Sequence, residues 1–513
     1  MILASSSNLG KADALVKLAD DLGAFVQKAV QEGSDLDTVE RGALAQALAI
    51  GRAAVDLFLQ GQGNGDLGDT VSTSADTVLY RSEAVVERPL RTIFGEHAFQ
   101  AFVYSRGSKR KIDLRPIDAR INLPEGKASY LLQEFTQLFC VEKAFGVGAR
   151  QFDTVFGQKL SVDVLEDINR AMGGDQADRF LDQLPTPPKK DEGAILVTTA
   201  DGKGVPLVKE DAQKVPAFDQ KERPGNRRMA TLGCVYTVDP YVRTPEQIVA
   251  ALFRDDTVPQ PSQDRPEACF KHYRAYFAEE GQDGKDHVPS AIPAWIWIAK
   301  EVKARHQAGQ PIIRLMDGQP NLREASEICL EELVAELREA PKPFALVDIL
   351  DILHVSGYVW KAAKAFHSHK EHQEAFVQER LLRILRGDAA GVITGMRRMA
   401  TQRDLKGEAL KAVTTACNYF ETNLDRMRYD EYLRAGYPIA SGVIEGACRH
   451  LIKDRMEQGG MRWTLEGAKA MLNVRSILAS SESERFSQWR PAEEAKRLHP
   501  HRDLIANPNE LKA

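Results

Sequence analysis

Residues 195–204 read Ile-Leu-Val-Thr-Thr-Ala-Asp-Gly-Lys-Gly, and residues 312–320 read Ile-Ile-Arg-Leu-Met-Asp-Gly-Gln-Pro. Each is a short apolar run typical of a buried strand, followed by an Asp-Gly pair. The pattern predicts that Asp201 and Asp317 stand at the carboxyl ends of two strands, the edge where open α/β sheets bind ligands. A single Asp-Gly pair is also typical of an ordinary turn, so the prediction of a ligand site rests on its occurrence after two strands.

Further apolar runs extend this pattern along the chain. Strands are predicted at 229–238 and 344–352, which makes residues 193–355 an α/β region. Residues 356–435 have helical periodicity throughout. Within that helical region, the stretch 380–411 holds eight basic residues against three acidic ones, which predicts a basic face able to bind DNA.

A third acid, Glu445, stands in the segment 441–450, which reads Ser-Gly-Val-Ile-Glu-Gly-Ala-Cys-Arg-His. Ser441 is the predicted N-cap of a helix, and a capping box would need Glu or Gln at position 444, which is Ile. Glu445 is therefore not explained as a capping partner, although an acid in a first turn also stabilises a helix by ~0.3–1 kcal/mol.

The helix that begins near Ser441 has two distinct faces. Ile444, Cys448 and Leu451 form an apolar stripe at helical spacing, and Arg449 and Lys453 follow Glu445 along the flank. An acid that is followed by basic residues on one flank suits a metal ion beside a phosphate group.

Three carboxylates can hold two divalent metal ions about 3.5–4 Å apart. Oxygen ligands favour Mg²⁺, with Mn²⁺ as a substitute, so we expect Asp201, Asp317 and Glu445 to bind two such ions. Competing chemistries lack their motifs, since the sequence contains no G-x-x-x-x-G-K-[ST], H-E-x-x-H or G-x-S-x-G.

Two regions precede the α/β region. Residues 1–60 are predicted to be helical, and residues 85–185 to form a DNA-binding module that ends at the Pro-rich segment 185–192, an expected linker. Two motifs predict that this module binds DNA: a basic hairpin, and a pair of helices at 148–156 and 161–172 with the spacing of a helix-turn-helix. A solvated hairpin tip and an ordinary helical pair are the alternative interpretations. The basic residues of the hairpin are Arg106, Lys109, Arg110, Lys111 and Arg115.

The composition excludes several classes of protein. The six cysteines form no C-x-x-C pair, which argues against a zinc ribbon and fits a reducing cytosol. The first residues contain no apolar run of a secretory signal, and no stretch of about 18 uncharged apolar residues predicts a membrane span. The net charge of −5 does not by itself indicate a nucleic-acid-binding protein, so the prediction of DNA binding rests on local basic clusters.

The segment 436–449, Gly-Tyr-Pro-Ile-Ala-Ser-Gly-Val-Ile-Glu-Gly-Ala-Cys-Arg, and Gly-Gly-Met-Arg-Trp at 459–463 resemble the bacterial insertion-sequence transposases of the ISKra group. The resemblance extends over roughly residues 88 to 480. It implies a DDE transposase with a ribonuclease-H-like core whose three acids correspond to Asp201, Asp317 and Glu445. On this basis, residues 356–435 are a helical insertion, 436–480 complete the core with its acidic helix, and 481–513 form a C-terminal tail.

The resemblance also implies an activity and its partners. We expect Mg²⁺-dependent cleavage at the terminal inverted repeats of a mobile element and joining to target DNA, by a homo-oligomer in a synaptic complex, in a bacterial cytoplasm close to the nucleoid. The candidate DNA contacts in this part of the chain are Arg449, Lys453, Arg455, Arg462 and Trp463, although Trp463 is equally a candidate core residue.

Asp351 and His354 resemble a Cys/Asp-x-x-His motif that follows the second acid in several transposase superfamilies. The alternative is a helix-start Asp beside a structural His. Asp348 and Asp351 are also rivals of Asp317 for the second acid. Two rival functions remain: a ribonuclease-H-fold nuclease that cuts without joining, and a non-catalytic DNA-binding protein descended from a transposase.

Overall fold

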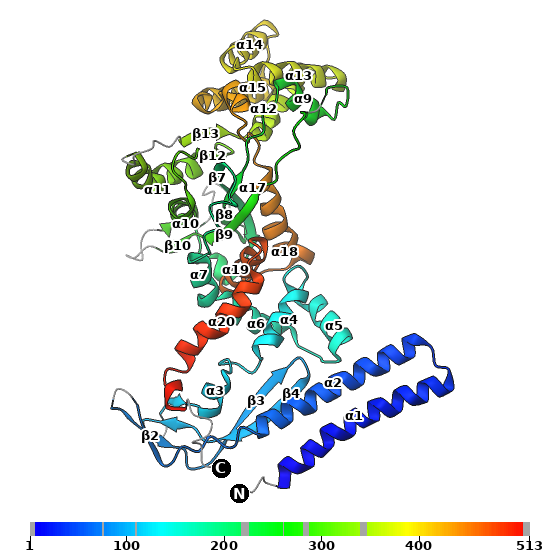
Figure 1. Ribbon diagram of the computed structural model, residues 1–513. Coiled ribbons are helices and arrows are strands. Elements are labelled where there is room, and N and C mark those ends of the chain that lie inside the picture. Colours follow the sequence, from blue (N-terminus) through cyan, green and yellow to red (C-terminus); the bar gives the residue numbers. More distant parts are fainter. Residues whose placement is uncertain are drawn as a thin grey trace. The chain divides into compact units, whose positions relative to one another are not determined.

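The computed structural model describes residues 6–73, 76–107, 110–216, 225–259, 261–280, 287–338 and 346–505, with the backbone alone at 6–11, 280 and 331–338. The chain forms two compact units. The first unit comprises Met1–Met172 and Ser483–Ala513, and the second unit comprises Gly173–Glu482. Both contain helices and strands, so the expected mixed α/β class is confirmed (Figure 1).

The first unit begins with a helical hairpin, as predicted for residues 1–60. Helix α1 (Ser6–Glu32) is followed by α2 (Leu36–Gln60), whose N-cap Asp35 accepts a hydrogen bond from the Thr38 backbone N–H. By length and composition α2 would be able to cross a membrane, although it is not an uncharged apolar stretch, since it contains Arg41, Arg52 and Asp56. A single helix of this kind is weak evidence for a membrane protein.

The strands of the first unit form a four-stranded antiparallel sheet, β1-β2-β5-β6, and a separate hairpin, β3-β4. The predicted basic hairpin is present between β5 and β6, where Tyr104 pairs with Leu114. The strand that enters this hairpin does not continue from β4, because β4 pairs with β3 whereas β5 pairs with β2. The bounds are β1 Thr70–Ser72, β2 Val78–Arg81, β3 Val86–Thr92, β4 Gly95–Ala101, β5 Tyr104–Ser105 and β6 Ile112–Leu114.

The predicted pair of short helices appears as α5 (Phe145–Phe156) and α6 (Val162–Gly173), with Gly157 ending α5 at a φ of 64°. The region 481–513 is not a simple tail, because it contains helix α20 (Ser483–Leu498), which packs within the first unit. Arg490 donates a 2.7 Å hydrogen bond to Gln133 Oε1. The remaining helices of this unit are α3 Pro116–Ile121, α4 Tyr130–Cys140 and η4 Arg502–Ile505.

The Pro-rich segment 185–192 lies inside the second unit, whereas the division between units falls after Met172. Glu192 forms an ion pair with Arg305 at 2.9 Å, and both side chains are 1% exposed. Because a buried ion pair is lost at a large energetic cost, this pair holds the segment against the core and does not allow it to act as a free linker.

The second unit is built on a five-stranded mixed sheet in the order β13-β12-β7-β8-β9. Strands β7, β8 and β9 form an antiparallel meander, and β12 and β13 extend it as parallel strands beside β7. Apolar runs predict four of these strands, but not β9, whose run is interrupted by Lys271 and Arg274. The bounds are β7 Ile195–Pro206, β8 Arg227–Val238, β9 Cys269–Phe277, β12 Ile312–Met316 and β13 Leu346–Leu350.

Asp201 does not end its strand as predicted. Strand β7 continues to Pro206 in a long hairpin with β8, in which Asp201 pairs with Leu232. On the other side, the paired positions with β12 end at Thr198, so Asp201 lies beyond the parallel part of the ladder.

The register brings three aspartates level with one another. Arg314 pairs with Thr198, and continuing that register by three residues sets Asp317 level with Asp201. Met316 pairs with Leu350, so one further residue sets Asp351 level with Asp317. Neighbouring strands are roughly 4.8 Å apart, so this row places three carboxylates at one edge of the sheet.

Opposite faces of the sheet carry different helices. A Cβ added at Gly233 would lie 3.2 Å from Ile298 of α10 (Ala291–Arg305), whereas the Cys234 thiol interacts with the Cys448 thiol. Successive residues of a strand point to opposite faces, so α10 covers one face and the segment around Cys448 covers the other. Asp201 has the same orientation as Cys234, since its partner Leu232 lies two residues before Cys234.

The predicted helical region between the last strand and Glu445 is confirmed as consecutive helices. They are α12 Ile352–Phe366, α13 Lys370–Leu385, α14 Ala389–Gln402, α15 Gly407–Thr422, η1 Leu424–Arg426 and α16 Tyr429–Arg434. The acidic helix follows as α17 Gly442–Ala447, a π-helical segment η2 Cys448–Lys453, and α18 Asp454–Met456, after which come η3 Gln458–Gly460 and α19 Leu465–Ala479. The other elements of this unit are α7 Asp175–Asp182, α8 Lys209–Ala212, α9 Pro245–Phe253, β10 Glu279–Glu280, β11 His287–Val288 and α11 Pro320–Arg338.

Candidate active site

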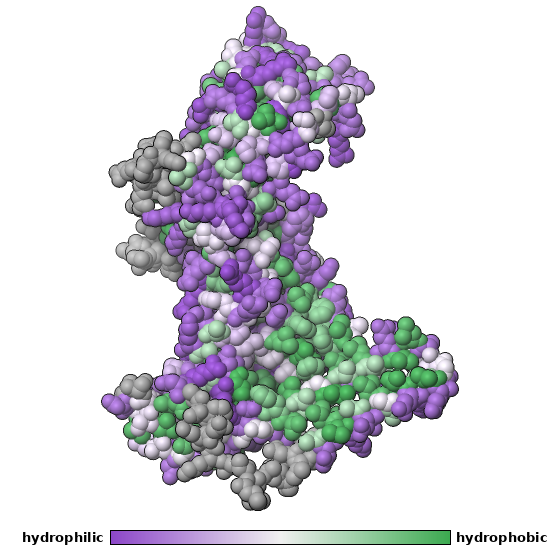
Figure 2. Space-filling view, in the orientation of Figure 1, coloured by the Kyte–Doolittle hydropathy of each residue, from purple (hydrophilic) through white to green (hydrophobic). Residues whose placement is uncertain are grey.

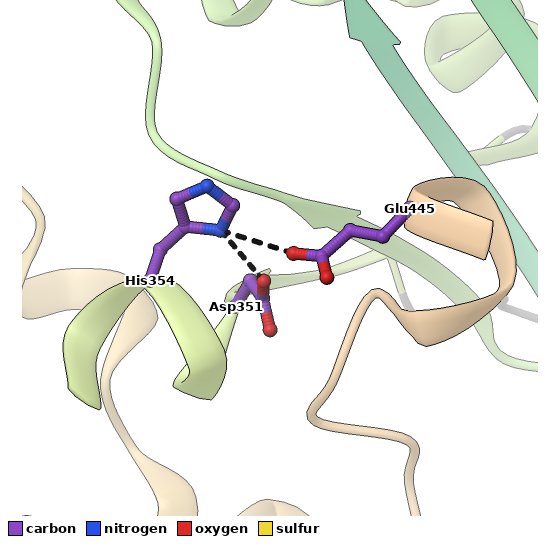
Figure 3. Close-up of side chains that lie close together, drawn as sticks. All are labelled: Asp351, His354 and Glu445. Atoms are coloured by element: carbon purple, nitrogen blue, oxygen red, sulfur yellow. Dashed lines mark hydrogen bonds and ion pairs between the residues drawn. The ribbon is translucent and has the colours of Figure 1, made fainter. Parts of the chain in front are cut away.

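An acidic cluster lies where the row of aspartates meets the acidic helix. We define it as Asp201, Asp317, Asp351, Glu445 and the neighbouring His354. Ligand atoms of Asp351, His354 and Glu445 all lie within 4.8 Å of one another, and Figure 3 shows their side chains converging from the start of α12 and from α17. This closest group differs from the predicted triad, because it contains Asp351 and His354 in place of Asp201 and Asp317.

Asp351 is fully buried, and four hydrogen bonds hold its carboxylate. It accepts from the backbone N–H groups of Leu353 (3.0 Å) and Ser441 (3.2 Å), from the Ser441 hydroxyl (2.7 Å) and from His354 Nδ1 (2.7 Å). Burial alone would raise the pKa of Asp351, but these hydrogen bonds outweigh it and lower that pKa below its ordinary value. Asp351 therefore combines the N-cap of α12 with the positioning of His354 and Ser441.

His354 is the cation of the cluster. The hydrogen bond to Asp351 raises the pKa of His354 to about 9, against the opposing effect of burial, and the charges of Asp317 and Glu445 act in the same direction. His354 Nδ1 is also 3.6 Å from Glu445 Oε1. A protonated imidazole thus offsets part of the negative charge where the carboxylates converge.

Glu445 projects from the first turn of α17 with 39% of its side chain exposed. The Ser441 hydroxyl is 3.3 Å from Glu445 Oε1, so one serine contacts two acids of the cluster. Burial and the negative charge of Asp351 raise the pKa of Glu445, and His354 opposes that rise. Ser441 does occupy the predicted N-cap position, but its hydroxyl makes no capping bond to the helix backbone.

Asp317 follows β12, and two hydrogen bonds stabilise the tight turn that begins at this residue. Asp317 Oδ1 accepts from the Gln319 backbone N–H (3.0 Å), and the Tyr419 hydroxyl donates to the Asp317 carbonyl oxygen (2.6 Å). Gly318 has a φ of 80°, and an added Cβ there would lie 2.9 Å from the Leu350 side chain, so glycine suits the turn. Burial, Asp201 and Asp351 raise the pKa of Asp317.

Asp201 faces an open pocket of about 440 Å³ beside the acidic helix. The Cys448 thiol lies against its carboxylate, and burial together with Asp201 raises the pKa of that thiol. The pocket is lined by Asp201, Lys203, His354, Glu445, Cys448, Arg449, Lys453 and Asp454. Its lining therefore combines carboxylates with the cationic side chains of Lys203, Arg449 and Lys453, of which Arg449 also lies 3.9 Å from Asp454.

The structure brings some predicted DNA contacts to this pocket and not others. Arg449 and Lys453 are exposed and line it. Arg455 is 1% exposed with its guanidinium 4.7 Å from the centre of the Trp463 ring, and Trp463 is 6% exposed, so both lie in the core and a DNA phosphate does not reach Arg455 in this conformation. Arg462 is exposed outside the pocket lining.

The basic hairpin residues belong to the first unit. Arg106 forms an ion pair with Asp113 at 3.3 Å, whereas Arg110 and Lys111 are exposed. Lys109 lies outside the described residues. The described part of the hairpin therefore presents exposed basic side chains.

Asp348 is excluded from the site by its orientation. Its carboxylate forms an ion pair with Arg314, the residue beside it in the β12–β13 register, with Arg314 Nη2 2.5 Å from Asp348 Oδ2. Arg314 also donates to the Ser326 hydroxyl at 2.9 Å. Asp348 therefore joins strand β13 to β12 and α11, and it is the weakest of the three candidates for the second acid.

The basic residues of the helical region are largely paired with acids. Arg383 lies 2.6 Å from Asp388, and Arg397 lies 2.6 Å from Glu421. Arg403 donates to the Phe366 carbonyl oxygen. Six of the eight basic residues at 380–411 form ion pairs: Arg380, Arg383, Arg386, Arg397, Lys406 and Lys411. The predicted strongly basic face is thus largely neutralised.

The sequence interpretation missed three side chains of the site: Ser441, Lys203 and Cys448. Ser441 stands four residues before Glu445, and Lys203 two residues after Asp201. These spacings place each of them beside an acid once the helix or strand is assigned. Cys448 was assigned to the apolar stripe, which its 4% exposure confirms, but it also contacts Asp201.

The donor set suits a hard divalent cation. One oxygen of Asp317 (Oδ2) and one of Glu445 (Oε2) accept no hydrogen bond from the described residues, whereas both oxygens of Asp351 are used. Carboxylate oxygens with free positions are the ligands that Mg²⁺ and Mn²⁺ prefer. Burial, together with the charges of neighbouring acids, raises the pKa values of Asp317 and Glu445, and a bound cation would stabilise their ionised forms.

Comparison with known proteins gives no further assignment: no protein-family model matches the sequence, and no curated protein matches it.

Proposed function

We propose that the protein is a DDE-type transposase, which cleaves DNA at the ends of a mobile element and joins them to target DNA. The observation that carries the proposal is that Asp201 and Glu445 line one pocket together with Arg449 and Lys453. Asp317 lies next to this pocket, close enough to Asp201 for the charge of Asp201 to raise its pKa. Carboxylates for metal ions beside cations for phosphates are the requirements of metal-assisted phosphodiester chemistry.

The fold supports the same proposal. An antiparallel meander extended by two parallel strands, with acids at neighbouring strands and a last acid on a helix, is the arrangement expected of a ribonuclease-H-like core. The helices between β13 and α17 correspond to an insertion in that core. The π-helical segment after α17 adds to this, because such segments often occur at functional sites.

The residues of the site divide into three roles. Asp201, Asp317 and Glu445 would hold Mg²⁺ or Mn²⁺, which supplies activation of the attacking oxygen and stabilisation of the leaving oxygen. Asp351 is a positioning residue, because its oxygens are occupied by His354, Ser441 and backbone donors. Lys203, Arg449 and Lys453 would bind the phosphates that flank the scissile bond.

The closeness of Asp351, His354 and Glu445 does not make Asp351 the second metal-binding acid in this proposal. A carboxylate with four hydrogen bonds would have to lose some of them to bind an ion, whereas Asp317 has a free oxygen and a raised pKa. We therefore retain Asp317 as the second acid.

The direct test uses a duplex that carries the ends of the element flanking the gene. We expect cleavage with Mg²⁺ or Mn²⁺ and none in excess EDTA. Glu445→Gln should lower single-turnover cleavage by at least about 1000-fold, the scale for a member of a catalytic unit, while calorimetry shows weaker Mn²⁺ binding to the DNA-free protein. Glu466→Gln, an exposed acid in the first turn of α19, is the matched control. Full activity in EDTA would overturn the metal-dependent reaction.

The two rival functions give different products in the same assay. A nuclease without strand transfer cleaves the ends but leaves a supplied target plasmid unjoined. A non-catalytic descendant binds the ends and produces neither product under any metal. Joined products that require Glu445 support the transposase.

A further inference from the structure

A second pocket, of about 800 Å³, lies in the second unit beside the acidic cluster. One wall is formed by Leu353 of α12 and by Gly442 and Val443 at the start of α17. The other walls come from the end of β8 and from the loops that follow β8 and precede β9. No part of the sequence interpretation or of the proposed roles uses this pocket.

Two arginines line this pocket, Arg243 and Arg265, and their charges act on one another. Arg243 is partly buried, and its guanidinium is fixed by hydrogen bonds to the carbonyl oxygens of Tyr437 (3.0 Å) and Tyr241 (3.2 Å). Burial lowers the pKa of Arg243, and the positive charge of Arg265 lowers it further. Arg265 is exposed, and among the residues that the structure describes neither arginine forms an ion pair, although Asp239 and Glu267 also line the pocket.

Such a pair is a candidate anion site on physical grounds. Like charges in a partly buried pocket repel one another more strongly than in water, and they are stabilised when an anion binds between them. A guanidinium presents a planar set of donors that matches phosphate oxygens. Lys271 adds a third cation to the lining, against Asp239 and Glu267. Asp239 Oδ1 already accepts from the Ala194 backbone N–H (3.0 Å).

Aromatic side chains accompany the cations. Tyr241 is half-buried, and the Arg243 guanidinium lies 5.2 Å from the centre of its ring. Tyr236, 3% exposed, contributes to the pocket from strand β8. A phosphate site beside an aromatic ring suits a nucleotide, because nucleobases stack on aromatic side chains irrespective of sequence.

The pocket and the acidic cluster share the starts of two helices. Leu353 lines the pocket, and the next residue, His354, belongs to the cluster. Gly442 and Val443 line the pocket, and Glu445 follows Gly442 by three residues, roughly 4.5 Å along a helix. A DNA strand with one phosphate at the cluster therefore has a neighbouring nucleotide within reach of the pocket.

We infer that this pocket binds one nucleotide of the DNA substrate, with a phosphate between Arg243 and Arg265 and a base against Tyr241. The inference rests on the proposed function for its choice of DNA as the ligand. It adds a positioning site at the start of α17, whereas Arg449 and Lys453 follow the end of that helix, so that the scissile strand is held near both ends of α17.

The test measures binding of a fluorescent 20-nucleotide single-stranded DNA to the full-length protein without divalent metal. Arg265→Gln should weaken binding about 5- to 20-fold and reduce the dependence of log Kd on log salt by about one, as loss of a phosphate contact requires. Lys209→Gln, which removes a charge from exposed helix α8, should change the affinity less than about twofold. Equal affinities of Arg265→Gln and the wild-type protein would overturn the inference.

Two further measurements locate the contact and identify the ligand. Photo-crosslinking of an oligonucleotide that carries 5-iododeoxyuridine should modify Tyr241, and crosslinks found only outside the pocket would overturn the inference. Deoxyadenosine monophosphate should compete only at concentrations far above those of the oligonucleotide. Equal competition would identify a free-nucleotide pocket and overturn the assignment to DNA.

The outcome is separable from that of the proposed function. Loss of oligonucleotide affinity in Arg265→Gln, in a protein that cleaves no DNA with any metal, supports the pocket and contradicts the transposase. Metal-dependent cleavage that depends on Glu445, with unchanged oligonucleotide binding by Arg265→Gln, contradicts the pocket alone.

Discussion

The acidic cluster and the helical region of residues 356–435 carry their charges in opposite ways. In the cluster, four carboxylates converge on one cationic side chain, His354, and two of them, Asp317 and Glu445, have raised pKa values. In the helical region, arginines such as Arg383 and Arg397 lie beside acids that neutralise them. The two regions follow one another along the chain, since α12 begins next to Asp351.

This difference separates a ligand site from a solvated surface. Converging like charges destabilise the folded protein, so a site that retains them is expected to bind something of opposite charge. Paired charges on an exposed surface are already satisfied and contribute little to stability or binding. By this criterion the acidic cluster and the Arg243–Arg265 pocket are stronger candidates for ligand binding than the basic face predicted for residues 380–411.

The largest expected effect distinguishes Asp317 from Asp348. Asp317→Asn should lower single-turnover cleavage by at least about 1000-fold, because it removes a metal-binding oxygen from the cluster. Asp348→Asn should keep cleavage within about tenfold and lower the unfolding temperature, because Asp348 pairs with the buried Arg314. Near-normal cleavage by Asp317→Asn, with an inactive and folded Asp348→Asn, would reverse the assignment.

A smaller loss is expected when the support of the cluster is removed. Ser441→Ala deletes the hydroxyl that contacts Asp351 and Glu445, and should lower cleavage by about 10- to 100-fold, the range for residues that position metal ligands. Ser441→Thr, which keeps the hydroxyl, should restore most of the rate. If Ser441→Thr is as impaired as Ser441→Ala, packing and not hydrogen bonding explains the loss.

Repulsion between the acids of the cluster predicts that a substitution that lowers cleavage can raise the stability of the folded protein. Because burial and neighbouring acids raise the pKa of Asp317, its ionised form destabilises the folded state, and Asp317→Asn should raise the unfolding temperature by a few degrees in metal-free buffer. Asp351→Asn should lower it, because hydrogen bonds lower the pKa of Asp351 and make its ionised form stabilising. Thermal melts in EDTA at pH 7 provide the measurement, and a lower unfolding temperature for Asp317→Asn would contradict the repulsion.

The smallest effect is expected in the helical region. Arg397→Gln breaks an exposed ion pair with Glu421, and it should change the affinity for end DNA by less than about twofold. Arg449→Gln is the comparison, since Arg449 lies in the pocket, and it should weaken binding by about 5- to 20-fold. Similar losses in the two variants would restore the helical region as a DNA-binding surface.

Local patterns in the sequence were enough to predict many elements. Apolar runs identified β7, β8, β12 and β13, and helical periodicity identified the helices between residues 356 and 435. The apolar stripe of Ile444, Cys448 and Leu451 is buried as predicted. These features depend on residues a few positions apart, so the sequence displays them directly.

Long-range pairing decided what the local patterns left open or predicted wrongly. Strand β7 continues past Asp201 because β8 pairs with it as far as Pro206, and the region after residue 481 forms α20 within the first unit. Arg455 was predicted to contact DNA, and Trp463 to contact DNA or to lie in the core; the structure packs the two on each other in the core. None of these partners is visible in the spacing of nearby residues.

The sequence by itself determined which acids were available and which elements carry them. The tertiary structure decided how these acids are placed. The strand register sets Asp351 level with Asp317, and the Asp351 carboxylate accepts hydrogen bonds from His354 and Ser441. It also decided that most basic residues at 380–411 form ion pairs, whereas Arg243 and Arg265 form none with the residues that the structure describes. Secondary structure follows from local periodicity, but the charge that a side chain experiences depends on neighbours that only the folded chain brings within a few ångströms.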